Sequence, residues 1–189
     1  MKKKILALTI VVICLSIMAY GTLAYFSFEG TATNTIVTGH LKVELVELSE
    51  QDGQLVPFED VVGVMPGTDV SKIVMVRNIG EHAAWVRIAV ETAIELADGV
   101  EGETDPSLIS LDINTDAWTL QDGYYYYNEA LEGGEETASL FTKVSFAAEM
   151  GNMYQSSKTV ITVGVQAVQV ANNGATVFEA AGWPEADSQ

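Results

Sequence analysis

Apolar and polar residues alternate with a period of two along most of this chain, a pattern typical of half-buried β-strands. In the last such run, Ile161, Val163 and Val165 alternate with more polar or smaller residues. The strands predicted in this way are 40–48, 70–77, 85–96, 108–113, 117–120, 123–127, 139–147 and 159–170. Strands at this spacing predict an all-β fold, an antiparallel β-sandwich of jelly-roll type.

Turn residues separate these runs. Asp122-Gly123 predicts a two-residue hairpin between strands 117–120 and 123–127. The pair Pro66-Gly67 suits a type II turn, because proline sets the first central φ angle and glycine accepts the positive one.

One short helix is expected near the C-terminus. Thr176 and Glu179 have the spacing of a capping box, Gly182 can end the helix, and Pro184 blocks its continuation.

The first residues have the pattern of a secretory signal peptide. Lys2, Lys3 and Lys4 precede an apolar run over 5–18, which we expect to form a signal helix, and small residues follow it. We expect cleavage after Ala24, with Thr22 and Ala24 in the two small pockets of the peptidase and Tyr25 as the first mature residue. Cleavage after Gly21 and retention as an uncleaved N-terminal anchor are the alternatives.

Residues 25–189 are expected to form a single β-sandwich domain. The one cysteine, Cys14, lies inside the apolar run of the signal peptide, so the mature chain would have no disulfide and would depend on its hydrophobic core.

The charge of the chain is strongly acidic and unevenly distributed. The sequence has 9 Lys and Arg residues against 26 Asp and Glu, a formal charge of -17. Without the three lysines at 2–4, 6 basic residues remain against 26 acidic ones, a charge of -20. Such a surface repels phosphate backbones and anionic lipids, so nucleic-acid binding is excluded and no membrane association is expected after cleavage.

Motifs of catalysis are absent from the sequence. His40 and His82 do not belong to a His-Glu-x-x-His zinc motif, and there is no nucleophile elbow, P-loop or dinucleotide fingerprint. We therefore expect a protein that is not an enzyme and has no catalytic or cofactor-binding residues.

Two acidic clusters raise the question of calcium. Asp112, Asn114 and Asp116 match the first ligand positions of an EF-hand loop, but Ala117 stands where that loop needs glycine. The segment 97–107 carries further carboxylates. Solvated loops are the favoured interpretation of both clusters, with calcium binding as the alternative.

Four consecutive tyrosines, Tyr124, Tyr125, Tyr126 and Tyr127, lie in one predicted strand. Two rings should face the core and two the other side of the sheet. The outer pair either packs against solvent-facing or cross-strand neighbours or forms an interaction surface.

Several segments together resemble one known family. These are the start of the mature region, 21–27, with 32–34 and 39–41; the turns at 66–67 and 78–80 with the strand that follows; and 118–127, leading to Leu140-Phe141. They are similar to the TasA/camelysin family of exported proteins with a SipW-type signal peptide.

The resemblance implies a secreted structural protein of the extracellular or biofilm matrix of a Gram-positive-type bacterium, processed by a signal peptidase of SipW type. It also implies that the segment after the cleavage site, 25–36, is a donor strand that inserts into the next subunit, with Tyr25, Phe26, Phe28 and Ile36 along it. Head-to-tail insertion of this kind does not close, so it generates a fibre.

Three alternatives stay open at this level. The segment 25–36 could pair within its own sheet or remain a free terminus. The protein could act as a monomeric adhesin or binding module, through the tyrosines or the acidic loops. A camelysin-like protease is the third alternative, although no zinc motif in the sequence supports it.

Overall fold

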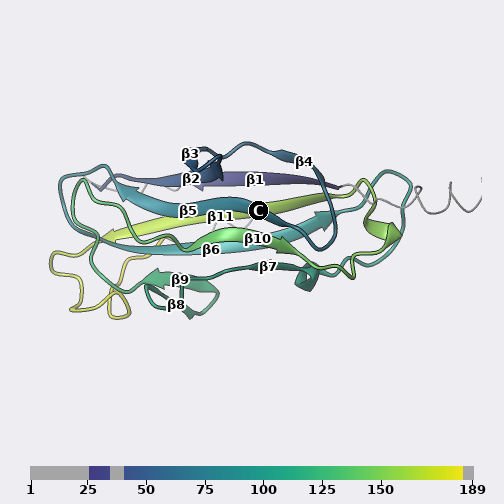
Figure 1. Ribbon diagram of the computed structural model, residues 1–189. Helices are drawn as coiled ribbons and strands as arrows, with labels where there is room; N and C mark the ends of the chain where they lie inside the picture. Colours follow the sequence, from purple (N-terminus) through teal and green to yellow (C-terminus); the bar gives the residue numbers. More distant parts are fainter. Residues whose placement is uncertain (1–25, 35–40, 185–189) are drawn as a thin grey trace, which may run out of the picture.

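The computed structural model describes residues 26–34 and 41–184, which form two β-sheets packed face to face (Figure 1). The six-stranded sheet consists, in spatial order, of β4 (Val61–Val64), β1 (Phe26–Asn34), β11 (Lys158–Gln169), β6 (Ala84–Glu95), β9 (Tyr124–Tyr127) and β8 (Trp118–Gln121). The five-stranded sheet consists of β3 (Gln54–Pro57), β2 (Val43–Gln51), β5 (Asp69–Asn78), β10 (Phe141–Phe146) and β7 (Ile109–Leu111). The all-β sandwich expected from the alternation is confirmed, and its jelly-roll winding stays a prediction.

The long strands run lengthwise along the molecule, and the short strands lie at its sides (Figure 1). Edge strands β3 and β4 lie on one side of the sandwich, while β8 and β9 lie on the opposite side. Neighbouring strands in the described part of the chain are antiparallel, except for β1 and β11, which are parallel.

The core lies between the two sheets and follows the predicted alternation. Side chains on one phase of each long strand are removed from solvent, and their burial is the main favourable term for this fold. The five-stranded sheet contributes Val43, Leu45, Val74, Val76, Phe141 and Val144, and the six-stranded sheet contributes Val86, Ile88, Trp118, Ile161, Val163 and Val165.

Two hairpins are closed by the same dipeptide. Asp122 and Gly123, between β8 and β9, have φ angles of 49° and 81°, and Asp52 and Gly53, between β2 and β3, have φ angles of 51° and 77°. Positive φ at both central residues is the geometry of a type I′ turn, which matches the twist of the paired strands. The predicted hairpin at Asp122-Gly123 is confirmed, and the one at Asp52-Gly53 was not anticipated.

Each of the eight predicted strands overlaps a strand of the structure, but other elements differ from expectation. Strands β3 and β4 were not predicted, and two 3-10 helices, η1 (Pro106–Leu108) and η2 (Asn152–Tyr154), flank β7 and β11. The segment 171–184 contains turns where a short helix was expected. The predicted signal peptide, 1–24, with its signal helix, lies outside the described residues.

The C-terminal turn uses the residues predicted to cap a helix. The Glu179 carboxylate accepts a hydrogen bond from the backbone N–H of Ala175 at 3.0 Å, and the Glu179 N–H donates to the Thr176 carbonyl at 3.1 Å. A helix this short is not stable by itself, so packing of the segment on the sheet decides its conformation. No helix in the described part of the chain has the length and apolarity needed to cross a bilayer.

Candidate functional site

Strand β1, the first described element of the chain, lies in the six-stranded sheet between β4 and β11 and pairs with both. We use the word groove for the position that β1 fills between these two strands. Phe28 stands opposite Thr159 of β11 in a parallel register that continues to Asn34 and Val165. On its other side β1 pairs with β4, where Phe28 faces Val61. The candidate donor segment is therefore paired within its own sheet in this structure. Of its named residues, Tyr25 and Ile36 lie outside the described residues, as do the cleavage residues Thr22 and Ala24.

Phe28 anchors β1 to the core. Its side chain is fully buried. Its ring meets those of Phe58 and Phe146 edge to face, with centroids 5.3 Å and 6.1 Å away. Offset and edge-to-face contacts of this kind add to the stabilisation that burial of the ring provides. Phe28 thus links β1 to the facing sheet through Phe146 of β10.

A buried ion pair lies beneath this aromatic cluster. Lys72 of β5 is 0% exposed, and its Nζ is 2.5 Å from Oε1 of Glu47 on β2. The ammonium group also lies over the Phe58 ring, 3.9 Å from its centroid, and 5.9 Å from that of Phe28. The groove that holds β1 therefore has a charged floor covered by aromatic rings.

The environment of Lys72 disfavours its charged form. Burial lowers the pKa of Lys72, and the hydrogen bond and charge of Glu47, with a smaller contribution from Asp60, offset part of that decrease. An ammonium held in this way is stabilised by the carboxylate and the ring faces around it, since water has been displaced.

Sequence reasoning missed this pair, although a signal for it exists. Lys72 shares the alternation phase of Val74 and Val76, which are buried, and Glu47 shares the phase of Leu45. A charged residue on the apolar phase of each of two neighbouring strands indicates a buried pair.

The four tyrosines divide between two cores. Tyr125 and Tyr127 pack against the main core, and the Tyr127 ring lies 5.1 Å from that of Trp118. Tyr124 and Tyr126 belong to a second cluster on the outer face of the six-stranded sheet. The outer pair, expected to face solvent, a cross-strand neighbour or a partner, is thus covered by other parts of the same chain.

The C-terminal segment 171–184 provides that cover. Trp183 packs edge to face on Tyr126, and the Trp85 indole N–H donates to the Asn173 carbonyl at 3.1 Å. Val177 is fully buried in the same cluster. The loops after β11, yellow in Figure 1, therefore form part of the folded molecule.

Arg87 of β6 joins this segment to the sheet. Its guanidinium donates to the Tyr126 hydroxyl at 2.9 Å and to Gln166 Oε1 at 2.8 Å. It also lies over the rings of Tyr124 and Trp183, 3.9 Å and 4.5 Å from their centroids. The planar guanidinium combines hydrogen bonding with stacking, which a lysine could not reproduce.

The carboxylate of the first acidic cluster serves a structural purpose. Asp112 accepts hydrogen bonds from the backbone N–H groups of Thr142 and Lys143 at 2.8 Å and 2.7 Å and from the Thr142 hydroxyl at 2.5 Å. These contacts lie where the register between β10 and β5 shifts. Burial raises the pKa of Asp112, but the hydrogen bonds from Thr142 and Lys143 outweigh it, so the pKa is lowered.

The second acidic segment is also tied locally. Asp105 precedes the 3-10 helix η1 and accepts hydrogen bonds from the Ser107 N–H and hydroxyl at 3.0 Å and 2.6 Å, which lower the pKa of Asp105. Within residues 26–34 and 41–184, no three or more His, Cys, Asp or Glu residues gather where they could hold a metal ion.

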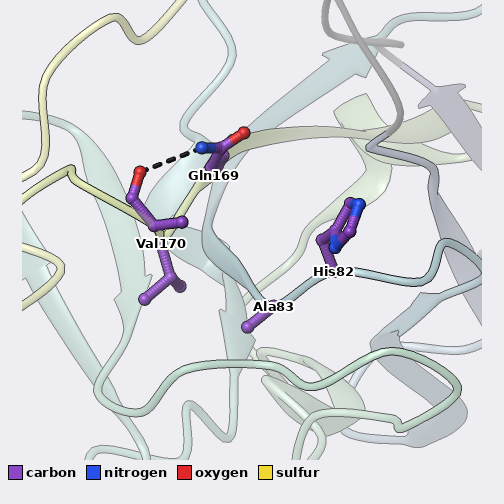
Figure 2. Close-up of a pocket in the computed structure, with 5 residues that line it drawn as sticks. His82, Ala83, Gln169 and Val170 are labelled. Carbon is purple, nitrogen blue, oxygen red and sulfur yellow. Dashed lines mark hydrogen bonds between the residues drawn. The ribbon is translucent and has the colours of Figure 1, made fainter.

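A shallow hollow of about 320 Å³ lies beside His82. Figure 2 shows His82 and Ala83 on one side of it and Gln169 and Val170 on the other. The Gln169 amide donates to the Ala171 carbonyl at 2.9 Å, so it is already engaged. The hollow is lined by His82, Ala83, Gln169, Val170 and Ala171. His40 lies outside the described residues.

Comparisons of the chain with protein-family models, with curated proteins and with solved structures found no match.

Proposed function

We propose that this chain is a secreted structural protein that assembles into fibres of an extracellular matrix by exchanging strand β1 between copies. One observation carries the proposal: β1 fills a groove between two other strands and buries Phe28 completely, yet it follows directly on the segment with signal-peptide character. A strand at the free end of the mature chain can leave its place without pulling other elements along, and the unpaired edges of β4 and β11 and the pocket of Phe28 are then open to the same strand of another copy.

The parallel pairing with β11 also supports exchange. Strand addition supplies a complete ladder of backbone hydrogen bonds, and an anchor side chain supplies specificity. Both are provided by the sequence of β1 and not by its covalent attachment, so β1 of a second copy fits the same groove. Each copy then offers one strand and one groove, and the contact propagates because it does not close.

Export and cleavage are part of this proposal. A signal peptidase of SipW type would release Tyr25 as the new N-terminus and so free the donor strand, and the product would lie outside the cell or on its surface. The resemblance of residues 21–27 to the TasA/camelysin family supports this step. The proposed role is structural and not catalytic.

A disulfide trap tests the exchange. Thr31 of β1 stands opposite Thr162 of β11, and strands lie about 5 Å apart, within reach of a disulfide. In a Cys14→Ser chain, Thr31→Cys and Thr162→Cys are made in separate preparations, which are mixed and oxidised. We expect covalent dimers joined between positions 31 and 162, identified by mass spectrometry.

The control uses a cysteine on the opposite edge of the same sheet. Leu120 of β8 is 60% exposed, and Leu120→Cys replaces Thr162→Cys in the mixture. Two results together would contradict exchange: a dimer yield no higher than that of this control, and a disulfide that forms only within one chain in the double variant Thr31→Cys/Thr162→Cys. They would show that β1 stays paired within its own chain.

Electron microscopy provides an independent test. Deletion of residues 25–35 removes the donor strand, so filaments formed by the parent chain should disappear. Filaments that persist without this segment would refute assembly by strand exchange.

A further inference from the structure

The Lys72–Glu47 pair is an unusual floor beneath the aromatic rings of Phe28 and Phe58. Two well-packed apolar residues in place of a buried ion pair are often as stable or more stable, so the pair is weak support for stability. Buried charges contribute specificity in some proteins, because they penalise arrangements that leave them uncovered. The pair can therefore distinguish strands that cover the Lys72 ammonium group from strands that leave it uncovered.

The ring of Phe28 is part of the cover over that charge. Lys72 Nζ lies over the rings of Phe58 and Phe28, 3.9 Å and 5.9 Å from their centroids. Phe58 belongs to the chain that forms the groove, whereas Phe28 belongs to the strand β1 that fills it. The face of an aromatic ring attracts a desolvated cation, and an aliphatic side chain of similar volume does not.

The sequence of β1 offers few residues that could take this position. A slip of two residues in one direction brings Gly30 opposite Thr159, and Gly30 has no side chain to cover the ammonium group; the opposite slip brings Phe26, the other aromatic residue of β1. A slip of one residue brings Ser27 or Glu29 to that position and turns the strand over.

We propose that the buried Lys72–Glu47 pair makes the groove between β4 and β11 selective for a strand with an aromatic side chain opposite Thr159. The ligand is an extended segment with the sequence of β1, and Phe28 is the residue that the groove recognises. Where that segment comes from a second copy the inference rests on the proposed function; where it comes from the same chain it does not.

The test measures how firmly β1 occupies its groove. In a Cys14→Ser chain with Thr31→Cys and Thr162→Cys, the equilibrium constant for the 31–162 disulfide is measured against oxidised and reduced glutathione. We expect Phe28→Leu to lower this constant at least threefold. In a second background, Lys72→Met/Glu47→Leu, no cation needs a ring, so the same substitution should lower it at least twofold less, and the loss that remains is that of packing on Phe58 and Phe146.

Phe26→Leu is the matched control, because it makes the same substitution two positions away on the same strand and should have the same effect in both backgrounds. Equal losses for Phe28→Leu in the two backgrounds would overturn the proposal, since packing alone would then explain them. If Phe28→Leu loses its β-strand circular dichroism, Phe28→Met gives the same comparison.

The outcome is separable from that of the proposed function. A gel without reductant shows whether the 31–162 disulfide lies within one chain or between two, and the selectivity ratio is defined in either case. Failure of strand exchange would leave this ratio intact, and failure of the selectivity would leave the mixed dimers intact.

Discussion

The role of a single residue in this protein depends on the residues that surround it in the folded structure. Asp112 belongs to a sequence cluster that partly matches a calcium loop, yet its carboxylate accepts three hydrogen bonds from Thr142 and Lys143. These partners are about 30 residues away, so no local pattern could identify them. The aspartate stabilises the irregular start of β10 at the position where its register with β5 shifts.

Replacement of Asp112 by alanine should lower the free energy of unfolding by about 1 to 2 kcal/mol, because two backbone N–H groups lose a charged acceptor at a partly solvated site. Asp116→Ala is the control, since the structure gives its carboxylate no side-chain hydrogen bond within the described residues. Urea unfolding measures both. A loss for Asp116→Ala as large as that for Asp112→Ala would contradict the assignment.

The same residue predicts a pH dependence. The pKa of Asp112 is lower in the folded chain than in the unfolded one, so its contribution is present above about pH 4 and is lost as the pH falls through the folded value. Stability measured by urea unfolding should therefore fall less steeply between pH 5 and about pH 2 in Asp112→Ala than in the parent. Parallel curves for the two chains would exclude this linkage.

The buried pair gives a second prediction at this scale. Glu47→Leu leaves Lys72 buried without its carboxylate and should cost about 3 kcal/mol or more, whereas Lys72→Met/Glu47→Leu should be close to the parent in stability. Thermal or urea unfolding of the three chains checks this. If the double variant is as unstable as the single one, the charges themselves stabilise the fold and the argument for selectivity loses its basis.

At the scale of elements, strands with a strong alternation were predicted well, and those with weak patterns were not. The phase of Val74 and Val76 in β5 or of Ile161 and Val163 in β11 is visible in the sequence because one face is buried. Strands β3 and β4 have four residues each, of which β3 exposes three and β4 two, so burial imposes little pattern on them. The turn Asp52-Gly53 was the available signal for β3.

The C-terminal segment illustrates the opposite case. Its capping residues predicted a helix, but contacts of Arg87, Tyr126 and Trp183 hold it as turns on the outer face of the six-stranded sheet. Trp183→Ala should lower the free energy of unfolding by about 1 to 2 kcal/mol through lost apolar burial and cation–π contact. Hydrogen exchange within 171–184 should rise at the same time.

Trp183→Phe is the control for that change, because it keeps an aromatic ring on Arg87 and should lose less than half as much stability. Hydrogen exchange in 171–184 that is the same in Trp183→Ala as in the parent would show that the segment is held by other contacts, such as those of Val177 and Asn173.

For the whole molecule, the acidity is the property with the widest consequence. With three basic residues in the first four positions, the remainder carries a charge of -20, and copies that stack bring like charges together. The Debye length falls from about 30 Å at 0.01 M salt to about 3 Å at 1 M, so salt weakens this repulsion.

Assembly should therefore increase with salt, with divalent cations, and as the pH approaches the isoelectric point of about 4.2. Light scattering of the purified chain at fixed concentration measures this. The control is the Leu120→Cys chain with its thiol capped by a neutral reagent, which leaves the charge of the chain unchanged. Scattering that is indifferent to all three conditions would mean that repulsion between copies does not limit assembly.

The sequence by itself determined the class of fold, the phase of most strands and the distribution of charge, because these depend on local alternation and on composition. Only the tertiary structure decided which residues meet: the pairing of β1 with β11, the Lys72–Glu47 pair beneath Phe28, and the packing of Trp183 on Arg87. These contacts join positions between 25 and 131 residues apart, and their energies come from burial and from the removal of water around charges. Neither quantity exists until the chain has folded and brought these distant positions together.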